Sequence, residues 1–289
     1  MKILIFGTTG LLGQALASYF VKKNYEVTGI ARKNANINID ITSDNSVLEI
    51  LNQNNYDVII NTVAIVNHKL CEDDIGFAYK VNSHPASIIA EHSKKTGAYF
   101  IQISTDHYYS GDNNLLHKET DTIKLLNEYA RTKYCAEIFT LLNAGSLVVR
   151  TNIVGFRNGD APTFVEWIIN NLQNNIQMAL FNDYYTSSIH VKQFAEILGD
   201  IIIKKPSGIL NIAARECFSK ELFIRTIADK LGLSLKNSNT DSVFNSGLVV
   251  RAESLGLDVS KAEKIIGYKF PVLNEVIESL CNEYNGNYR

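Results

Sequence analysis

The chain has 289 residues, of which 46% are apolar and 20% are charged, so it can bury one large core or two moderate ones. This composition excludes a disordered chain and a fibrous repeat. Lys and Arg total 28 against 30 for Asp and Glu, a formal net charge of -2 with no run of like charges. We therefore expect no nucleic-acid partner.

The positions of the cysteines and histidines argue against a framework of disulfide bonds and against metal sites. The four cysteines lie far apart without a CxxC pair, and the six histidines form no HxH or HExxH group. No stretch reaches about 18 uncharged apolar residues, and the first apolar run is too short for a signal peptide. We expect a cytoplasmic protein with reduced thiols, no membrane span and no metal.

The first half of the chain alternates short apolar runs with helical patterns. Apolar runs that predict strands lie at 2–6, 26–30, 58–60, 99–103 and 147–149. Helical spacing begins at Leu11 and returns at 46–51, 78–95 and 128–142. Strands that are apolar on both faces and separated by helices predict a doubly wound parallel sheet of the Rossmann type. This α/β domain is predicted to cover residues 1–150.

Beyond residue 150 the alternation changes. Helices are predicted over 163–174, 191–204, 220–231 and 273–282, with a turn at 182–183. No clean linker marks the boundary. We predict a smaller C-terminal α/β domain over residues 151–289, mainly substrate-binding, from which some segments return to pack on the first domain.

A glycine pattern separates the first predicted strand from the first predicted helix. Gly7, Gly10 and Gly13 enclose Thr8-Thr9 and Leu11-Leu12 in a GxxGxxG spacing. The first glycine permits a tight turn, the second a close approach of a pyrophosphate to the backbone, and the third close packing of helix on strand. The pattern predicts a dinucleotide site; a turn with incidental glycines is the alternative.

The end of the second predicted strand carries two cations, Arg32 and Lys33, where an NAD site usually has an acid. The guanidinium fork of Arg32 suits a 2′-phosphate and Lys33 adds a point charge, so the pattern favours NADPH, with NADH possible. A solvated basic turn is the alternative. Asp40 and Ile41, after the next short run, are expected to flank the adenine.

Tyr129 and Lys133 are four residues apart, which places both on one face of a helix. A free phenol is a poor acid at neutral pH, but a neighbouring ammonium favours the phenolate and makes proton transfer easier. The spacing predicts a proton donor and its supporting cation. Alone, it is also common in ordinary helices.

Polar residues follow the strand predicted at 99–103, at the edge where open α/β sheets bind ligands. A hydroxyl of Ser104 or Thr105 can share a substrate carbonyl oxygen with Tyr129; an ordinary hydrogen bond at the strand end is the alternative for both. Asp106 is either a site residue or a turn or helix cap.

These motifs together resemble the extended short-chain dehydrogenase/reductase family. Within it, the sequence is most similar to the dTDP-4-dehydrorhamnose reductase branch, and the late segments 251–253 and 257–261 extend the similarity over nearly the whole chain. The chain departs from the branch pattern where Val63-Ala64-Ile65-Val66 replaces Ala-Ala-x-Thr, where His68-Lys69 replaces Val-Asp, and where Ala252 replaces a proline.

The resemblance implies a role for each matching residue. Thr105, Tyr129 and Lys133 would be the catalytic hydroxyl, proton donor and supporting lysine, with Asp106 assisting near the sugar. The substrate would contact Thr105, Asp106, Tyr129 and Arg251. The cofactor would contact the glycine loop with Leu11 and Leu12, the pairs Arg32-Lys33, Asp40-Ile41 and Val63-Ala64, and Lys133.

The resemblance therefore implies an NADPH-dependent reductase of the 4-keto group of a nucleotide-activated deoxysugar, acting in cell-surface polysaccharide biosynthesis as a monomer or homodimer. Two alternatives stay open at this point. One is an epimerase or dehydratase that retains NAD, and the other is a non-catalytic, NADP-binding regulatory subunit.

Overall fold

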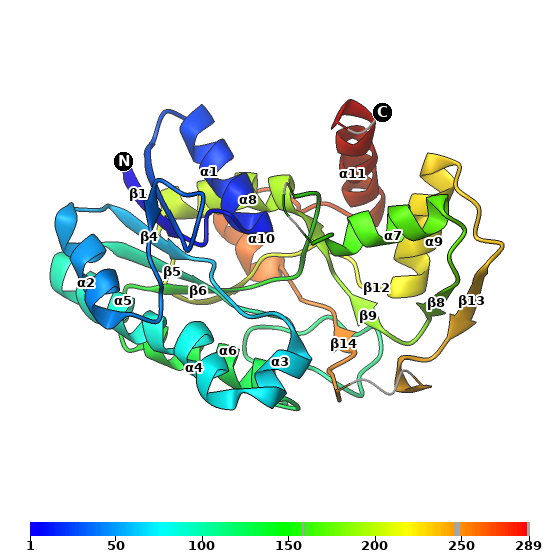
Figure 1. Cartoon of the computed structure of the whole chain (residues 1–289), viewed down its shortest axis with the longest axis horizontal. Helices are drawn as coiled ribbons and strands as arrows, with labels where there is room; N and C mark the ends of the chain where they lie inside the picture. The colour runs from blue at the N-terminus through cyan, green and yellow to red at the C-terminus, as the bar shows by residue number, and fades with distance from the viewer. Residues whose placement is uncertain (158, 160, 246–248, 288–289) are drawn as a thin grey trace. The chain divides into compact units, whose positions relative to one another are not determined.

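The computed structural model describes residues 1–157, 159, 161–245 and 249–287 (Figure 1). The chain forms two compact units. The first contains Met1–Thr105, Leu125–Arg150 and Ala195–Leu210; the second contains Asp106–Lys124, Thr151–Phe194 and Asn211–Arg289. Residues 106–124 thus belong to the second unit although they precede residue 150, and residues 195–210 belong to the first unit although they follow it.

A seven-stranded sheet forms the centre of the first unit. Its strands, in spatial order, are β11 (Gly208–Asn211), β6 (Leu147–Arg150), β5 (Tyr99–Ile103), β4 (Val58–Asn61), β1 (Lys2–Phe6), β2 (Glu26–Ala31) and β3 (Ile37–Asn38). All pairings from β3 to β6 are parallel. Strands β4, β5 and β6 are buried along their whole length, as expected of a parallel sheet covered on both faces. The predicted doubly wound α/β fold is confirmed.

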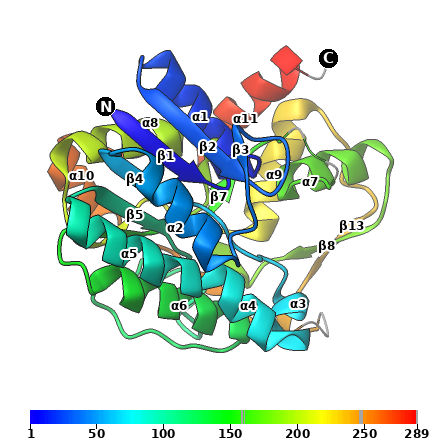
Figure 2. The ribbon, with the colours of Figure 1, turned by 60° about the vertical axis from the view of Figure 1, so that its left-hand side comes forward.

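Helices cover both faces of this sheet (Figure 2). On one face, α2 (Asp44–Gln53), α5 (His84–Thr96) and α6 (Glu128–Leu141) pack on the apolar side chains of β1, β4 and β5. On the other face lie α1 (Leu11–Lys22) and α8 (Val191–Lys204). These two helices touch at Gly199, where a Cβ would come within 2.5 Å of the Tyr19 ring.

The single helix predicted over 78–95 is wrong. The structure has two helices there, α4 (Ile75–Asn82) and α5, which meet at Ser83. Pro85 lies in the first turn of α5, where its missing N–H costs nothing, whereas inside one continuous helix its ring would clash with the carbonyl of Val81, four residues earlier. A further short helix, α3 (His68–Asp73), begins after Asn67, whose side chain accepts from the Leu70 N–H. The sequence pattern did not indicate α3.

The second unit combines short strands with longer helices. Its strands are β7 (Ile153–Val154), β8 (Met178–Phe181), β9 (Tyr185–Thr186), β10 (Ile189–His190), β12 (Phe218–Ser219), β13 (Ser238–Asp241) and β14 (Ser254–Leu255). Its helices are α7 (Phe164–Gln173), α9 (Lys220–Leu231), α10 (Ser260–Ile266) and α11 (Leu273–Asn287), with a 3-10 turn at Val243–Asn245. The apolar faces of α7, α9 and α11 share one core with β8.

The helices predicted at 191–204 and 220–231 are confirmed to the residue, and those predicted at 163–174 and 273–282 are confirmed with shifted ends. Within the described part of the chain, no helix combines the length and the apolar character that crossing a membrane requires.

Candidate functional site

The glycine loop lies between β1 and α1, as predicted. Gly7 has a φ of +91°, and a Cβ there would lie 2.4 Å from Thr62 Oγ1. A Cβ on Gly13 would lie 2.1 Å from the Gly7 carbonyl oxygen. The fold itself therefore requires glycine at these two positions.

Gly10 is different, because the fold leaves more room there. Its φ of -76° suits any residue. Apart from its chain neighbours and the backbone of its own helix, the one described atom within 4 Å of an added Cβ would be the Gly7 carbonyl oxygen, at 3.3 Å. Gly10 is also the N-cap residue of α1, where backbone N–H groups and the helix dipole favour an anion. A small residue at this point fits the close approach of a pyrophosphate to the loop.

The loop lies at the switch point of the sheet. The chain goes outward from β1 to β2 and β3 and then returns to β4 on the other side of β1. Open α/β sheets bind ligands at the carboxyl ends of the strands at such a switch point, here β1 and β4. Val63 follows β4, and its Cγ2 would lie 3.1 Å from a Cβ on Gly7. Val63 and Ala64 are both half-buried at this edge. Of the loop leucines, Leu12 is buried and Leu11 is half-buried.

The end of β2 reaches the same loop, because the Gly7 N–H donates to the Ile30 carbonyl oxygen at 2.7 Å. Arg32 and Lys33 follow immediately and are exposed. Asp40 is exposed, and two hydrogen bonds from Thr42 hold the pKa of its carboxyl below the usual range, with a smaller contribution from Arg32.

Ile41, in contrast, is buried in the core that α2 and α5 share. The structure thus places the glycine loop, the two cations and Asp40 along one edge of the sheet, and Ile41 beneath it.

Tyr129 and Lys133 lie one turn apart in α6, and both are buried. The Lys133 ammonium donates to the carbonyl oxygen of Ile103, the last residue of β5, at 2.7 Å. Thr105 follows two residues later and is also buried. Burial lowers the pKa of Lys133 to about 8, against the opposing charge of Glu137. The structure therefore brings Lys133 to the strand end that carries Thr105.

A buried ion pair fixes this part of α6. Glu137, one turn beyond Lys133, accepts from Arg150 of β6 at 3.1 and 2.8 Å and from the Ser104 hydroxyl at 2.5 Å. Both charged side chains are at most 3% exposed. The sequence analysis missed this pair, although Glu137 continues the four-residue spacing of Tyr129 and Lys133.

Asp106 belongs to the second unit and is 1% exposed. Its carboxylate accepts from the Asn152 side-chain amide at 2.8 Å, and His107 Nε2 lies 3.8 Å away. The charge of Asp106 also acts on Lys220, the first residue of α9.

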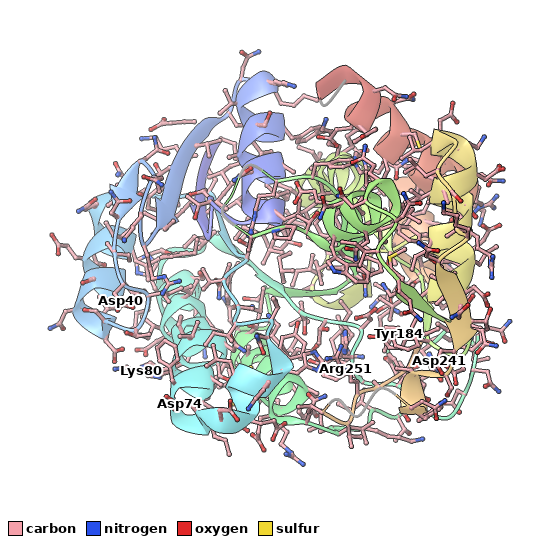
Figure 3. All side chains as sticks on the ribbon, turned by 45° about the vertical axis from the view of Figure 1, so that its right-hand side comes forward. Asp40, Asp74, Lys80, Tyr184, Asp241 and Arg251 are labelled. Carbon is pink, nitrogen blue, oxygen red and sulfur yellow. The ribbon has the colours of Figure 1, made fainter. Side chains whose placement is uncertain are left out.

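Lys220 is a second charged residue that the sequence analysis missed. Its ammonium lies 4.2 Å from the ring centroid of Phe164 and 5.8 Å from that of Tyr184, and burial lowers its pKa to about 8. Arg251, labelled with Tyr184 in Figure 3, has a buried Nε without a hydrogen-bond partner in the described part of the chain. The second unit thus contains a buried carboxylate, Asp106, and the cationic side chains of Lys220 and Arg251.

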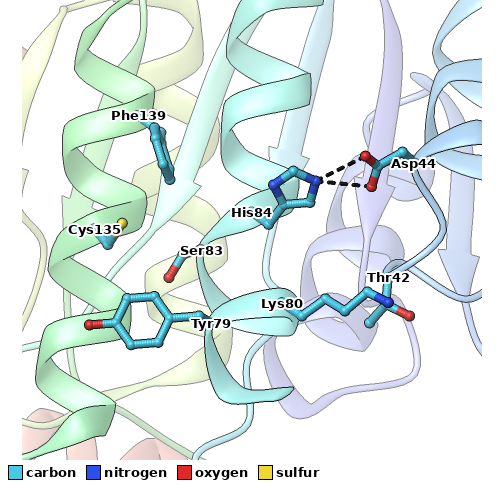
Figure 4. Close-up of a pocket in the computed structure, with 8 residues that line it drawn as sticks. All are labelled: Thr42, Asp44, Tyr79, Lys80, Ser83, His84, Cys135 and Phe139. Atoms are coloured by element: carbon cyan, nitrogen blue, oxygen red, sulfur yellow. Dashed lines mark hydrogen bonds and ion pairs between the residues drawn. The ribbon is translucent and has the colours of Figure 1, made fainter. Parts of the chain in front are cut away.

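An open pocket of about 610 Å³ lies elsewhere in the first unit (Figure 4). It holds an ion pair between His84 and Asp44 at 2.9 Å. Its described lining includes none of the residues predicted to be catalytic or to bind the cofactor, so the pocket does not mark the predicted site. The lining residues are Thr42, Asp44, Tyr79, Lys80, Ser83, His84, Cys135 and Phe139. Among the described residues, no group of three His, Cys, Asp or Glu side chains could hold a metal ion.

Comparison with known proteins gives full-length similarities. dTDP-4-dehydrorhamnose reductase from Aggregatibacter actinomycetemcomitans is 26% identical over 92% of this chain and 93% of its own. Methionine adenosyltransferase 2 subunit beta from Pongo abelii is 26% identical over 96% of this chain and 87% of its own. A solved dTDP-4-dehydrorhamnose reductase from Bacillus anthracis, in complex with NADP, has the same fold, with a TM-score of 0.87 and 22% identity over 98% of this chain and 99% of that one.

The family model for the RmlD substrate binding domain matches residues 1–285, which is nearly the whole sequence. The chain therefore belongs to the RmlD substrate binding domain family, in the dTDP-4-dehydrorhamnose reductase branch of the extended short-chain dehydrogenase/reductases that its motifs resemble.

Proposed function

We propose that this protein is an NADPH-dependent reductase of the 4-keto group of a nucleotide-activated deoxysugar, which acts in polysaccharide biosynthesis. Family membership supports a sugar-nucleotide reductase. The observation that carries the proposal is the position of Lys133, which lies one helical turn from Tyr129. Its buried ammonium donates to the carbonyl oxygen of Ile103 at the end of β5, and Ile103 is two residues before Thr105. This is the set of groups that protonation of a carbonyl oxygen requires.

The residues of the first unit fit NADPH. The glycine loop and the start of α1 would hold the pyrophosphate, Arg32 and Lys33 the 2′-phosphate, and Asp40 would lie near the adenine. Val63 and Ala64 would line the cofactor beside the loop. When bound, NADPH supplies the hydride. In this assignment the first unit binds the dinucleotide, and the second unit binds mainly the substrate.

The chain itself supplies the proton and the placement of the substrate. Tyr129 would donate its phenolic proton to the C4 oxygen, and the Lys133 ammonium would stabilise the resulting phenolate. Thr105 would donate a hydrogen bond to the same oxygen. Asp106 and Arg251 would hold polar groups of the substrate.

The direct test is turnover. The purified protein is incubated with NADPH and a panel of 4-keto-6-deoxy sugar nucleotides, and loss of the reduced cofactor is followed by its absorbance. We expect rapid oxidation with at least one member of the panel. Tight NADPH binding without oxidation for any member would contradict the reductase assignment.

The same test addresses a second candidate, a non-catalytic regulatory subunit that binds NADP. Similarity to methionine adenosyltransferase 2 subunit beta, over 96% of this chain, favours this candidate. It predicts cofactor binding without turnover. The buried Tyr129, Lys133 and Thr105 favour the enzyme, because a regulatory subunit has no need of them.

Replacing Gly10 with valine is expected to abolish NADPH binding and leave the fold intact. The backbone there suits a β-branched residue, but the added methyl groups would occupy the space of the pyrophosphate. Fluorescence titration measures the affinity and circular dichroism the fold. Gly76→Val, on an exposed part of α4, is the control. Unchanged NADPH affinity in Gly10→Val would show that the loop only forms a turn.

Replacing Arg32 with alanine is expected to reduce the preference for NADPH over NADH. The guanidinium is the group best suited to the 2′-phosphate, and one charge-assisted hydrogen bond contributes roughly 1.5–3 kcal/mol, about a 10-fold to 100-fold change in affinity. Dissociation constants for both cofactors are compared in the unmodified and variant proteins. Equal constants in the unmodified protein would contradict the assignment of Arg32.

A further inference from the structure

Helix α3 packs on the first turn of α6, the turn that carries Tyr129. Glu72 of α3 accepts a hydrogen bond from the Glu128 N–H at 2.7 Å, and the Asn127 side chain accepts from the Ala130 N–H at 2.9 Å. Two of the N–H groups that a helix start leaves without partners are therefore satisfied, one of them by α3. The carboxylate of Glu72 also complements the positive end of the helix dipole. The backbone on both sides of Tyr129 is thus held in place.

The ring of Tyr129 is held by His68, which lies one turn before Glu72 in α3. The two rings stack with centroids 4.8 Å apart and planes at 18°. Both side chains are buried, at 8% and 7% exposure. Stacked aromatic pairs are stabilised beyond the burial of their area, so this contact favours one orientation of the phenol.

A hydrogen bond fixes the imidazole in turn. Asn127 Nδ2 lies 3.5 Å from His68 Nδ1, and the single oxygen of that amide group accepts from the Ala130 N–H. An amide nitrogen can only donate, so Nδ1 is the acceptor and the neutral ring carries its proton on Nε2. Asn127 therefore sets both the start of α6 and the orientation of His68.

We propose that His68 is a positioning residue for the reaction, and that its stacked ring holds the Tyr129 phenol where it can protonate the substrate. This inference rests on the proposed function of Tyr129. Without the stacked ring the buried phenol keeps its chemistry but loses its fixed orientation.

The first test compares two replacements of His68. His68→Val removes the ring, and we expect turnover to fall roughly 10-fold to 100-fold, the effect of misplacing a reacting group by about 1 Å. NADPH affinity and KM for the sugar nucleotide should stay within about twofold, because the loss is confined to the proton-transfer step. His68→Phe keeps a stacking ring and should restore most of the turnover. Leu70→Ala, on the exposed side of α3, is the control.

Two outcomes would overturn the inference. Normal turnover in His68→Val would show that the ring is dispensable. A loss in His68→Phe as large as that in His68→Val would show that stacking is not what His68 provides.

A second measurement does not depend on turnover. The NMR signals of the Tyr129 ring, identified by their loss in Tyr129→Phe, should move in His68→Val because the ring current of the imidazole is removed. In His68→Phe they should keep a ring-current shift, because a stacked ring is still present. If no sugar nucleotide is reduced by the unmodified protein, the proposed function fails and these signals still test the stack. If the sugar is reduced but the signals do not move in His68→Val, the inference fails and the proposed function stands.

Discussion

Replacing Tyr129 with phenylalanine is expected to lower turnover by roughly 100-fold to 10,000-fold, the contribution of a positioned general acid. The substitution removes the hydroxyl and keeps the ring, so the stack on His68 and the packing around it are preserved. NADPH should bind as before. Steady-state turnover and a fluorescence titration of NADPH measure the two effects separately.

Tyr134→Phe, five residues further along α6, is the matched control and should keep near-normal turnover. A Tyr129→Phe protein with near-normal turnover on its true substrate would discard the proposed mechanism. It would also remove the main reason to prefer an enzyme over a regulatory subunit.

The pH profile gives an independent check on the same residue. Burial lowers the pKa of Lys133 to about 8, so this lysine carries its charge below that pH and loses it as the pH rises through it. The charge stabilises the phenolate that remains after proton transfer, and the phenol must itself be protonated in order to donate. Both requirements predict that activity falls on the alkaline side. That limb should be absent from the residual activity of Tyr129→Phe.

Replacing Glu137 with alanine is expected to lower the free energy of unfolding by about 3–5 kcal/mol, because it leaves a buried guanidinium without its partner. Arg150 is 2% exposed, and two of its hydrogen bonds go to Glu137. The Ser104 hydroxyl would lose its acceptor as well. Denaturant unfolding followed by circular dichroism measures the change.

Two further variants test whether the loss of stability comes from the unpaired guanidinium of Arg150. The double variant Glu137→Met with Arg150→Met removes both charges and should recover most of the lost stability, since an apolar pair of similar size needs no partner. Glu91→Ala breaks an exposed ion pair with Lys95 and should leave the unfolding midpoint unchanged. A Glu137→Ala protein as stable as the unmodified one would show that Arg150 finds another partner.

The sequence alone determined those features whose signals lie close together along the chain. Apolar runs bounded by turns predicted strands β1, β4, β5 and β6, and the spacing of Gly7, Gly10 and Gly13 predicted the loop after β1, because backbone conformation and side-chain periodicity are local properties. The spacing of Tyr129 and Lys133 likewise placed both on one face of α6. The split between α4 and α5 also had a local signal, Pro85, which the longer helical pattern concealed.

Only the tertiary structure decided the features that join distant parts of the chain. It placed β11 at the edge of the first sheet, grouped residues 106–124 with the second unit, paired Glu137 with Arg150, and stacked His68 on Tyr129. A buried charge or ring reveals its partner only when the packing of helices and strands is known, because its energy depends on desolvation and geometry rather than on its neighbours in the sequence. For this reason the spacing that identified Tyr129 and Lys133 could not also predict the residues that hold Tyr129 and α6 in place.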